Sequence, residues 1–210
     1  DKFKNVLEIN SKSSKISDLF KNNITITNEI NYSPIEKYIL CDIEHIHFEY
    51  NKFDLIINIL DLHHVDRIED TLLNIKNILL SGGKFIASLF TKSTLIELRD
   101  AIVNTQIRLD LPITPHIVPF ITIEDITKIM SMLKFKDIIV DSYTIVMEYE
   151  SVIALMYDLR AMGQTNVMNN RKYFRKDILS LIDKVYREKN SSTDDRIKAS
   201  FNIATITAGK

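Results

Sequence analysis

Acidic side chains stand at the ends of the apolar segments in the first quarter of the chain. Glu8 interrupts the apolar run 6–9, Glu29 follows a segment rich in isoleucine and threonine, and Asp42 follows the apolar residues 38–40. A carboxylate at the end of a parallel strand accepts hydrogen bonds from the amine and hydroxyl groups of a ligand at that edge of the sheet. The positions therefore predict a binding site for a small ligand with such groups.

The spacing of these acidic residues fits a nucleoside. Glu29 lies about 20 residues beyond the first strand, where an acidic side chain usually accepts the two ribose hydroxyl groups of a nucleotide. Asp42 is placed to accept the exocyclic amine of an adenine while Ile43 packs on the ring. The alternative for both carboxylates is a solvated position in a loop, without a ligand.

Three histidines are candidates for moving a proton at such a site. His63 and His64 follow the most apolar segment of the chain, and His116 lies among prolines. Each is equally well interpreted as a packed side chain. A metal site built from His63 and His64 with His45 and His47 is a further alternative, since His45 and His47 share one face of an extended segment. Two such pairs often arise by chance, so we assign no metal.

Composition excludes several functional classes. The 210 residues, 45% of them hydrophobic, are enough for one domain with a full core. A formal net charge of −1 argues against nucleic-acid binding, and no apolar run is long enough to span a membrane. The single cysteine, Cys41, excludes an internal disulfide and suits a reducing compartment. The basic segment 171–187 faces either solvent or an acidic partner or lipid surface.

Hydrophobic periodicity predicts an α/β fold. Strands are expected at 6–9, 23–30, 38–40, 53–60, 84–90, 137–145 and 201–207. Helices are expected after residue 14, from 33, and at 66–81, 94–107, 122–133, 151–162 and 171–187. This alternation predicts a mostly parallel sheet with right-handed crossovers and an antiparallel last strand.

Glycine and proline positions predict how these elements end. We expect Gly82 and Gly83 to end the helix 66–81 as a left-handed cap. Three prolines exclude a helix over 111–120. We therefore expect a single domain, 1–210, in which 91–120 forms a lid insertion after the fifth strand.

Several motifs resemble the class I S-adenosylmethionine (SAM) dependent methyltransferases. The loop 10–14, Glu29, Asp42, the strand 53–58 and the turn Leu-Ser-Gly-Gly-Lys-Phe at 80–85 occur in the order of that family. Four further motifs resemble one branch of it: Leu-His-His-Val at 62–65, Thr-Leu-Ile-Glu-Leu-Arg at 94–99, Pro-His-Ile-Val-Pro-Phe at 115–120, and Leu-Arg-Ala-Met-Gly-Gln-Thr-Asn at 159–166, followed by Asn-Arg at 170–171. That branch holds the mitochondrial complex I assembly-factor methyltransferase-like proteins and, more distantly, the malonyl-carrier-protein methyltransferase of biotin synthesis.

The resemblance implies a Rossmann-like sheet of seven strands, with SAM as cofactor across the ends of the first four. It implies Glu8 near the amino group of SAM, Glu29 on the ribose, and Asp42 with Ile43 at the adenine. Asn58 and Leu60 would flank the methionine portion.

The loop 10–14 departs from the family pattern. Glycines are usual where this chain has Asn10, Lys12 and Ser14. Asparagine tolerates the left-handed backbone, whereas Lys12 and Ser14 would each cost roughly 1–2 kcal/mol there. Two such costs would weaken SAM binding on the order of 100-fold, although Lys12 offsets part of them by pairing with the carboxylate of SAM.

Two functions stay open on this basis. The first is a SAM-dependent methyltransferase with an unidentified acceptor. The second is a divergent or inactive methyltransferase-fold protein that acts as a protein arginine hydroxylase or as an assembly factor for respiratory complex I. The expected partner is a protein acceptor or a respiratory-complex subunit, with peripheral membrane contact as an option. The expected location is the bacterial cytoplasm or the mitochondrial matrix, and we expect an N-terminal helical segment to be missing from this sequence.

Overall fold

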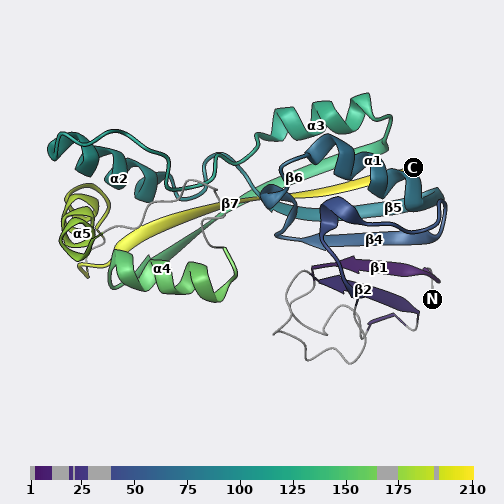
Figure 1. The fold of residues 1–210 in the computed structure, drawn as a ribbon, viewed down its shortest axis with the longest axis horizontal. Helices are drawn as coiled ribbons and strands as arrows, with labels where there is room; N and C mark the ends of the chain where they lie inside the picture. The colour runs from purple at the N-terminus through teal and green to yellow at the C-terminus, as the bar shows by residue number, and fades with distance from the viewer. Residues whose placement is uncertain (1–2, 11–18, 21, 28–38, 165–174, 192–193) are drawn as a thin grey trace. The chain divides into compact units, whose positions relative to one another are not determined.

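The computed structural model describes residues 3–10, 19–20, 22–27, 39–164, 175–191 and 194–210, and its strands form one seven-stranded sheet (Figure 1). The strand order is β3-β2-β1-β4-β5-β7-β6. The strands are β1 (Val6–Ile9), β2 (Asn23–Thr27), β3 (Ile39–Leu40), β4 (Phe53–Ile59), β5 (Leu79–Phe90), β6 (Lys136–Tyr149) and β7 (Ile197–Gly209). The α-helices are α1 (Ile68–Ile78), α2 (Ile96–Arg108), α3 (Ile123–Met132), α4 (Val152–Ala161) and α5 (Lys176–Asn190).

Strands β1 to β5 are parallel, and β7 runs antiparallel to β5. Ile9 of β1 lies opposite Ile26 of β2 and Asn58 of β4. The last strand pairs with β5 from Lys84 opposite Gly209 onward. The predicted sheet with a reversed last strand is therefore confirmed, and the carboxyl ends of β1 to β5 share one edge.

The chain divides into two compact units. The first comprises 1–91, 121–142 and 203–210, and the second comprises 92–120 and 143–202. The segment 92–120 thus groups with α4 and α5. The single domain over 1–210 and the lid role of 91–120 stay predictions.

In the first unit, the core lies mainly between the sheet and two helices. Leu7 and Ile56 on one face of the sheet belong to the same buried cluster as Leu72 of α1 and Met130 of α3, and Figure 1 shows α1 and α3 on one face of the sheet. Each such buried side chain stabilises the fold by about 1.5–3 kcal/mol relative to exposure. The opposite face has its own small cluster around Val6, Leu55 and Ile57.

The expected end of the helix 66–81 is wrong in detail. Helix α1 stops at Ile78 and the chain enters β5 at once, so Gly82 and Gly83 lie inside a strand and do not cap the helix. Gly82 still has a positive φ of 79°. A Cβ on Gly83 would come within 2.9 Å of the Leu80 carbonyl oxygen, so close backbone packing requires glycine there.

The other boundaries agree with expectation to within a few residues. Thr122 and Ser151 are the N-caps of α3 and α4, each accepting from a backbone N–H three residues on. No residue of the segment 111–120 is helical. The expected helices after residue 14 and from 33 lie outside the described residues, as do 28–30 at the end of the second expected strand.

Candidate functional site

Two polar side chains meet where β1 and β4 end. Asn10 follows β1 directly, and its Nδ2 donates a 2.5 Å hydrogen bond to Oδ1 of Asp61, which follows β4. Asn10 is 9% exposed and Asp61 is 4% exposed. Asn10 has a φ of 54°, so asparagine here adopts the left-handed backbone that the family's glycine would provide.

Glu8 lies two residues earlier, in β1 itself. It is 2% exposed and sits opposite Thr25 of β2 and Ile57 of β4. Glu8 and Asp61 therefore place two buried carboxylates at adjacent parallel strands near one sheet edge, an arrangement suited to a ligand with a cationic group.

Asn58 and Leu60 shape the end of β4. Asn58 is fully buried, and its Oδ1 accepts a 3.1 Å hydrogen bond from the backbone N of Leu62. Leu60 has a φ of 51°, and its backbone N donates to the Ser88 carbonyl oxygen at 2.8 Å. The left-handed turn at Leu60 redirects the chain from β4 toward Asp61.

Two of the buried polar atoms that have no hydrogen-bond partner among the described residues belong to Asn10 and Asn58, at this edge. They are Oδ1 of Asn10, an acceptor, and Nδ2 of Asn58, a donor. Buried polar groups are nearly always satisfied in folded proteins, and an unsatisfied one costs about 1–3 kcal/mol. One open acceptor and one open donor, beside two buried carboxylates, fit a ligand that has both an ammonium and a carboxylate, as SAM has.

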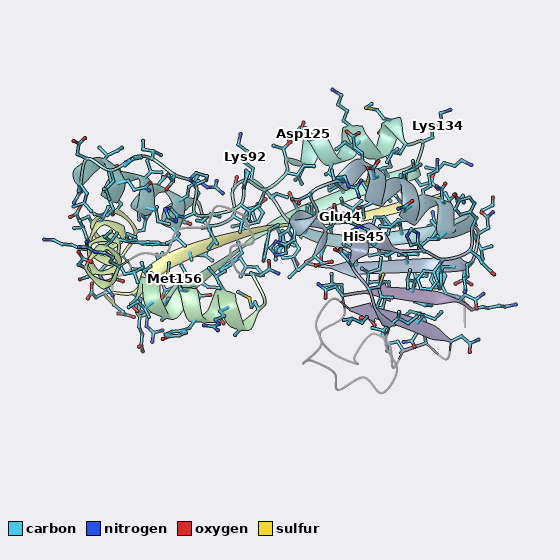
Figure 2. The ribbon with its side chains drawn as sticks, in the orientation of Figure 1. Glu44, His45, Lys92, Asp125, Lys134 and Met156 are labelled. Atoms are coloured by element: carbon cyan, nitrogen blue, oxygen red, sulfur yellow. The ribbon has the colours of Figure 1, made fainter. Side chains whose placement is uncertain are left out.

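Asp42 and Ile43 lie past the end of β3, at the same edge. Asp42 Oδ1 accepts a 3.0 Å hydrogen bond from the backbone N of Glu44 and so caps the short turn that begins at Ile43. Ile43 is 7% exposed, and Figure 2 labels Glu44 and His45 on this turn. An ionised carboxylate has about four acceptor positions, so Asp42 retains acceptor capacity for an adenine amine.

The candidate histidines are divided between the two units. In the first unit, the centroid of the His63 ring lies 4.3 Å from that of His64 and 4.9 Å from that of Phe90. Nδ1 of His63 accepts a 3.4 Å hydrogen bond from the backbone N of Phe90. His63 is thus a packed side chain, 7% exposed. In the second unit, His116 Nε2 lies 3.1 Å from the Thr114 hydroxyl.

Lys12 and Glu29 lie outside the described residues, so their predicted contacts stay predictions. Asp61 was not among the predicted binding residues, although its hydrogen bond joins the two central strands of the site. The sequence signal for it was its position directly after the strand 53–60. Recognising its partner requires the register that places Asn58 opposite Ile9.

No group of three or more metal-binding side chains that could hold an ion occurs within the part of the chain that the structure describes. None of the described helices is both long and apolar enough to cross a bilayer.

Comparisons with known proteins identify the family. A model of the methyltransferase domain matches residues 8–87. The mouse mitochondrial arginine-hydroxylase NDUFAF5 is 33% identical over 166 residues, which are 79% of this chain and 48% of that protein. RP459 of Rickettsia prowazekii, named for an inferred methyltransferase activity, is 30% identical and matches 79% of this chain and 77% of its own length. A malonyl-[acyl-carrier protein] O-methyltransferase of Ilyobacter polytropus is 25% identical, matching 79% of this chain and 59% of its own length. The chain spans about half the length of NDUFAF5.

Solved structures agree on the fold. The YcgJ protein of Bacillus subtilis superposes with a TM-score of 0.67 at 12% identity, covering 99% of this chain and 92% of that one. A Haemonchus contortus phosphoethanolamine N-methyltransferase in complex with S-adenosylhomocysteine superposes with a TM-score of 0.59 at 16% identity, and the match covers 99% of this chain and 49% of that one. With the relatives above, these matches show that the chain belongs to the class I methyltransferase family, in the branch that contains NDUFAF5 and the Rickettsia protein.

Proposed function

We propose that this chain binds SAM at the carboxyl edge of β1 and β4 and acts as a SAM-dependent methyltransferase on an acceptor still to be identified. The main support is the Asn10–Asp61 hydrogen bond together with the two unsatisfied polar atoms of Asn10 and Asn58. A second support is the family, whose solved relatives include a methyltransferase with S-adenosylhomocysteine bound.

In this proposal each element of the edge holds one part of the ligand. Glu8 faces the ammonium group, and Asn58 Nδ2 donates to the carboxylate. Asp42 accepts from the adenine amine while the buried side chain of Ile43 supports the ring. Glu29 would accept the ribose hydroxyls and Lys12 would pair with the carboxylate.

SAM supplies an activated methyl group, so the protein mainly has to align donor and acceptor and exclude water. The left-handed turns at Asn10 and Leu60 fix the backbone on both sides of the ligand. His63 and His64 follow β4 immediately and are candidates for accepting a proton from an acceptor that must lose one. The packing of His63 against Phe90 makes His64 the better candidate.

The second candidate function is protein arginine hydroxylation or assembly of respiratory complex I. Two observations favour it: the similarity to NDUFAF5 and the replacement of family glycines by Lys12 and Ser14. Under this alternative, the partner would be a complex I subunit. Location in the mitochondrial matrix or the cytoplasm of a bacterium fits the relatives, which are mitochondrial and rickettsial, and peripheral contact with a membrane is compatible with either.

The decisive experiment is calorimetric titration of the chain with SAM and with S-adenosylhomocysteine. We expect saturable binding of both. Glu8→Gln should weaken SAM binding about tenfold or more because it removes the charged partner of the ammonium. Glu69→Gln is the matched control, since Glu69 lies exposed in the first turn of α1, and it should leave the affinity unchanged.

A folded chain that binds neither ligand at millimolar concentration would overturn the SAM assignment. The two functions are separated by mass spectrometry of an arginine-containing complex I subunit incubated with the chain and SAM in aerated buffer that also contains a reductant, because hydroxylation consumes O₂ and two electrons. Methyl transfer adds the mass of one CH₂ group, whereas hydroxylation adds that of one oxygen atom. If the chain binds SAM but the mass of every subunit tested stays unchanged, a role in complex I assembly is the function that remains.

A further inference from the structure

The second unit contains a cavity of about 420 Å³ between α2 and the proline-rich segment that follows it. Its walls are mostly apolar: Ile102 and Val103 come from α2, and Ile113, Ile117 and Phe120 come from the segment 109–120. This volume lies within the range of small-molecule sites. The cavity therefore has room for the apolar body of a ligand.

Arg99 lines the same cavity and forms no ion pair with a carboxylate of the described residues. Its Nη1 donates to the backbone carbonyl oxygen of Lys92 at 3.3 Å. Its Nη2 is shielded from solvent and has no hydrogen-bond partner among the described residues. A shielded N–H group without an acceptor is unfavourable, so an anionic group that comes within reach of Arg99 would relieve that cost.

Lys92 adds a second positive charge beside Arg99. The contact of its backbone carbonyl with Arg99 brings these two lining residues together, and Figure 2 shows the Lys92 side chain extending outward from the ribbon. Within the described residues Lys92 forms no ion pair, and no acidic residue is among those that line the cavity. Among the described residues, therefore, no carboxylate of the lining neutralises the charge of Arg99 and Lys92.

A hydrogen-bonded group holds the wall formed by the proline-rich segment in place. Gln106, 4% exposed on α2, donates through Nε2 to the Thr114 hydroxyl at 3.1 Å, and the same hydroxyl lies 3.1 Å from His116 Nε2. These contacts tie the proline-rich segment to α2. The wall is thus fixed by internal contacts before any ligand binds.

We propose that this cavity binds an aliphatic carboxylate, with its carboxylate on Arg99 and Lys92 and its hydrocarbon chain along the apolar walls. A guanidinium binds a carboxylate through two parallel hydrogen bonds, and Arg99 is the lining residue that can form them. To cover the apolar walls, the ligand needs a longer hydrocarbon chain than a small acid such as acetate has. The site belongs to the second unit alone and does not depend on SAM binding in the first.

The test is calorimetric titration of the whole chain, without SAM, with octanoate, octan-1-ol and acetate. Octanoate has both the chain and the charge, octanol only the chain, and acetate only the charge. We expect saturable binding of octanoate, binding of octanol at least tenfold weaker, and no measurable binding of acetate. Shifts of isoleucine methyl resonances from Ile102 and Ile113 should locate the bound octanoate in the cavity.

Three substitutions make the test specific. Arg99→Gln should weaken the binding of octanoate about tenfold or more and leave the affinity for octanol unchanged. Ile113→Asp, at a side chain 63% exposed, should repel octanoate without disturbing the fold. Arg160→Gln removes one charge from an exposed arginine of the same unit that does not line the cavity, and it should change nothing. Equal affinities for octanoate and octanol, or an Arg99→Gln variant with normal octanoate binding, would overturn the proposal.

Discussion

Asn10 and Asp61 join the carboxyl ends of β1 and β4 through a 2.5 Å hydrogen bond. The opposite ends of the same two strands are joined by Asp54, which accepts from the backbone N of Lys4 at 2.6 Å and of Asn5 at 3.0 Å. Each end of this strand pair thus has one bridging carboxylate. Asp61 is nearly inaccessible, whereas Asp54 is half-buried. The strand pair therefore offers a natural comparison between a site carboxylate and a structural one.

Asp61→Asn should weaken the binding of S-adenosylhomocysteine by about 10- to 100-fold. The substitution removes the negative charge that polarises Asn10, and a charged hydrogen bond contributes about 1.5–3 kcal/mol. Calorimetric titration of the purified variant measures the change.

Asp54→Asn is the matched control, since it removes one charge at the other end of the same strands. It should lower the melting temperature and leave the affinity for S-adenosylhomocysteine unchanged. Equal losses of affinity in both variants would mean that Asp61 acts on strand pairing and not on the ligand.

The left-handed backbone at Asn10 predicts an unusual order of stability among its substitutions. Asn10→Gly and Asn10→Ala both lose the hydrogen bond to Asp61, but only glycine adopts a φ of 54° without steric cost. We expect the glycine variant to be more stable than the alanine variant by about 1 kcal/mol, measured by urea unfolding. At an ordinary strand or helix position the alanine variant would be the more stable one. An alanine variant more stable than the glycine variant would therefore show that residue 10 is not held in this conformation in solution.

The sequence predicted the sheet because its central strands are buried on both faces. The apolar runs of β1 and β4 have few alternatives to a central parallel strand, and the tolerance of asparagine for positive φ identified residue 10 as a turn. Asp61 was missed because its partner is 51 positions away. Which side chains meet at the sheet edge depends on the register between strands, which no local pattern specifies.

The expected glycine cap at Gly82 failed for a related reason. Glycine after an amphipathic helix usually caps it, but here Leu79 pairs with Phe53 of β4 at the point where α1 ends. The Lys210 ammonium reinforces this arrangement by donating to the carbonyl oxygens of Leu79 and Asn77. Pairing across the sheet thus overrides the local helix signal.

Cys41, next to Asp42, provides a chemical test of the adenine site. Burial raises the pKa of the Cys41 thiol, and the negative charge of Asp42 raises it further. Because the thiolate is the reactive form, iodoacetamide should modify Cys41 more slowly in the folded chain than in urea at pH 8, and the rate should rise steadily at higher pH.

Saturating SAM should slow this modification several-fold, because an adenine held by Asp42 and Ile43 would cover the neighbouring thiol. The same amount of SAM added to the urea-unfolded chain should have no effect, which controls for any reaction with the reagent. If the rate in the folded chain is the same with SAM bound, the adenine does not lie at Asp42.

Tyr149 gives the second unit a characteristic sensitivity to alkaline pH. Its hydroxyl donates a 2.6 Å hydrogen bond to Oδ2 of Asp158, linking the end of β6 to α4. Burial raises the pKa of Tyr149, and the hydrogen bond and charge of Asp158 raise it further. Because this pKa is higher in the folded state than in the unfolded chain, the tyrosine hydroxyl contributes its full stabilisation at pH values below the pKa of the unfolded tyrosine, near 10. That contribution is lost as pH rises above this value.

Tyr149→Phe should therefore lower the free energy of unfolding by about 1 kcal/mol at pH 7, a modest value because the pair is only partly buried. The difference between wild type and variant should shrink above pH 10, as tyrosine ionises in the unfolded chain. Tyr157→Phe is the control, since Tyr157 is 68% exposed on α4 and should show no pH-dependent difference. Urea unfolding at pH 7 and at pH 10.5 measures both quantities. A difference between wild type and Tyr149→Phe that stays constant with pH would show that the hydroxyl makes no ionisation-linked contact in the fold.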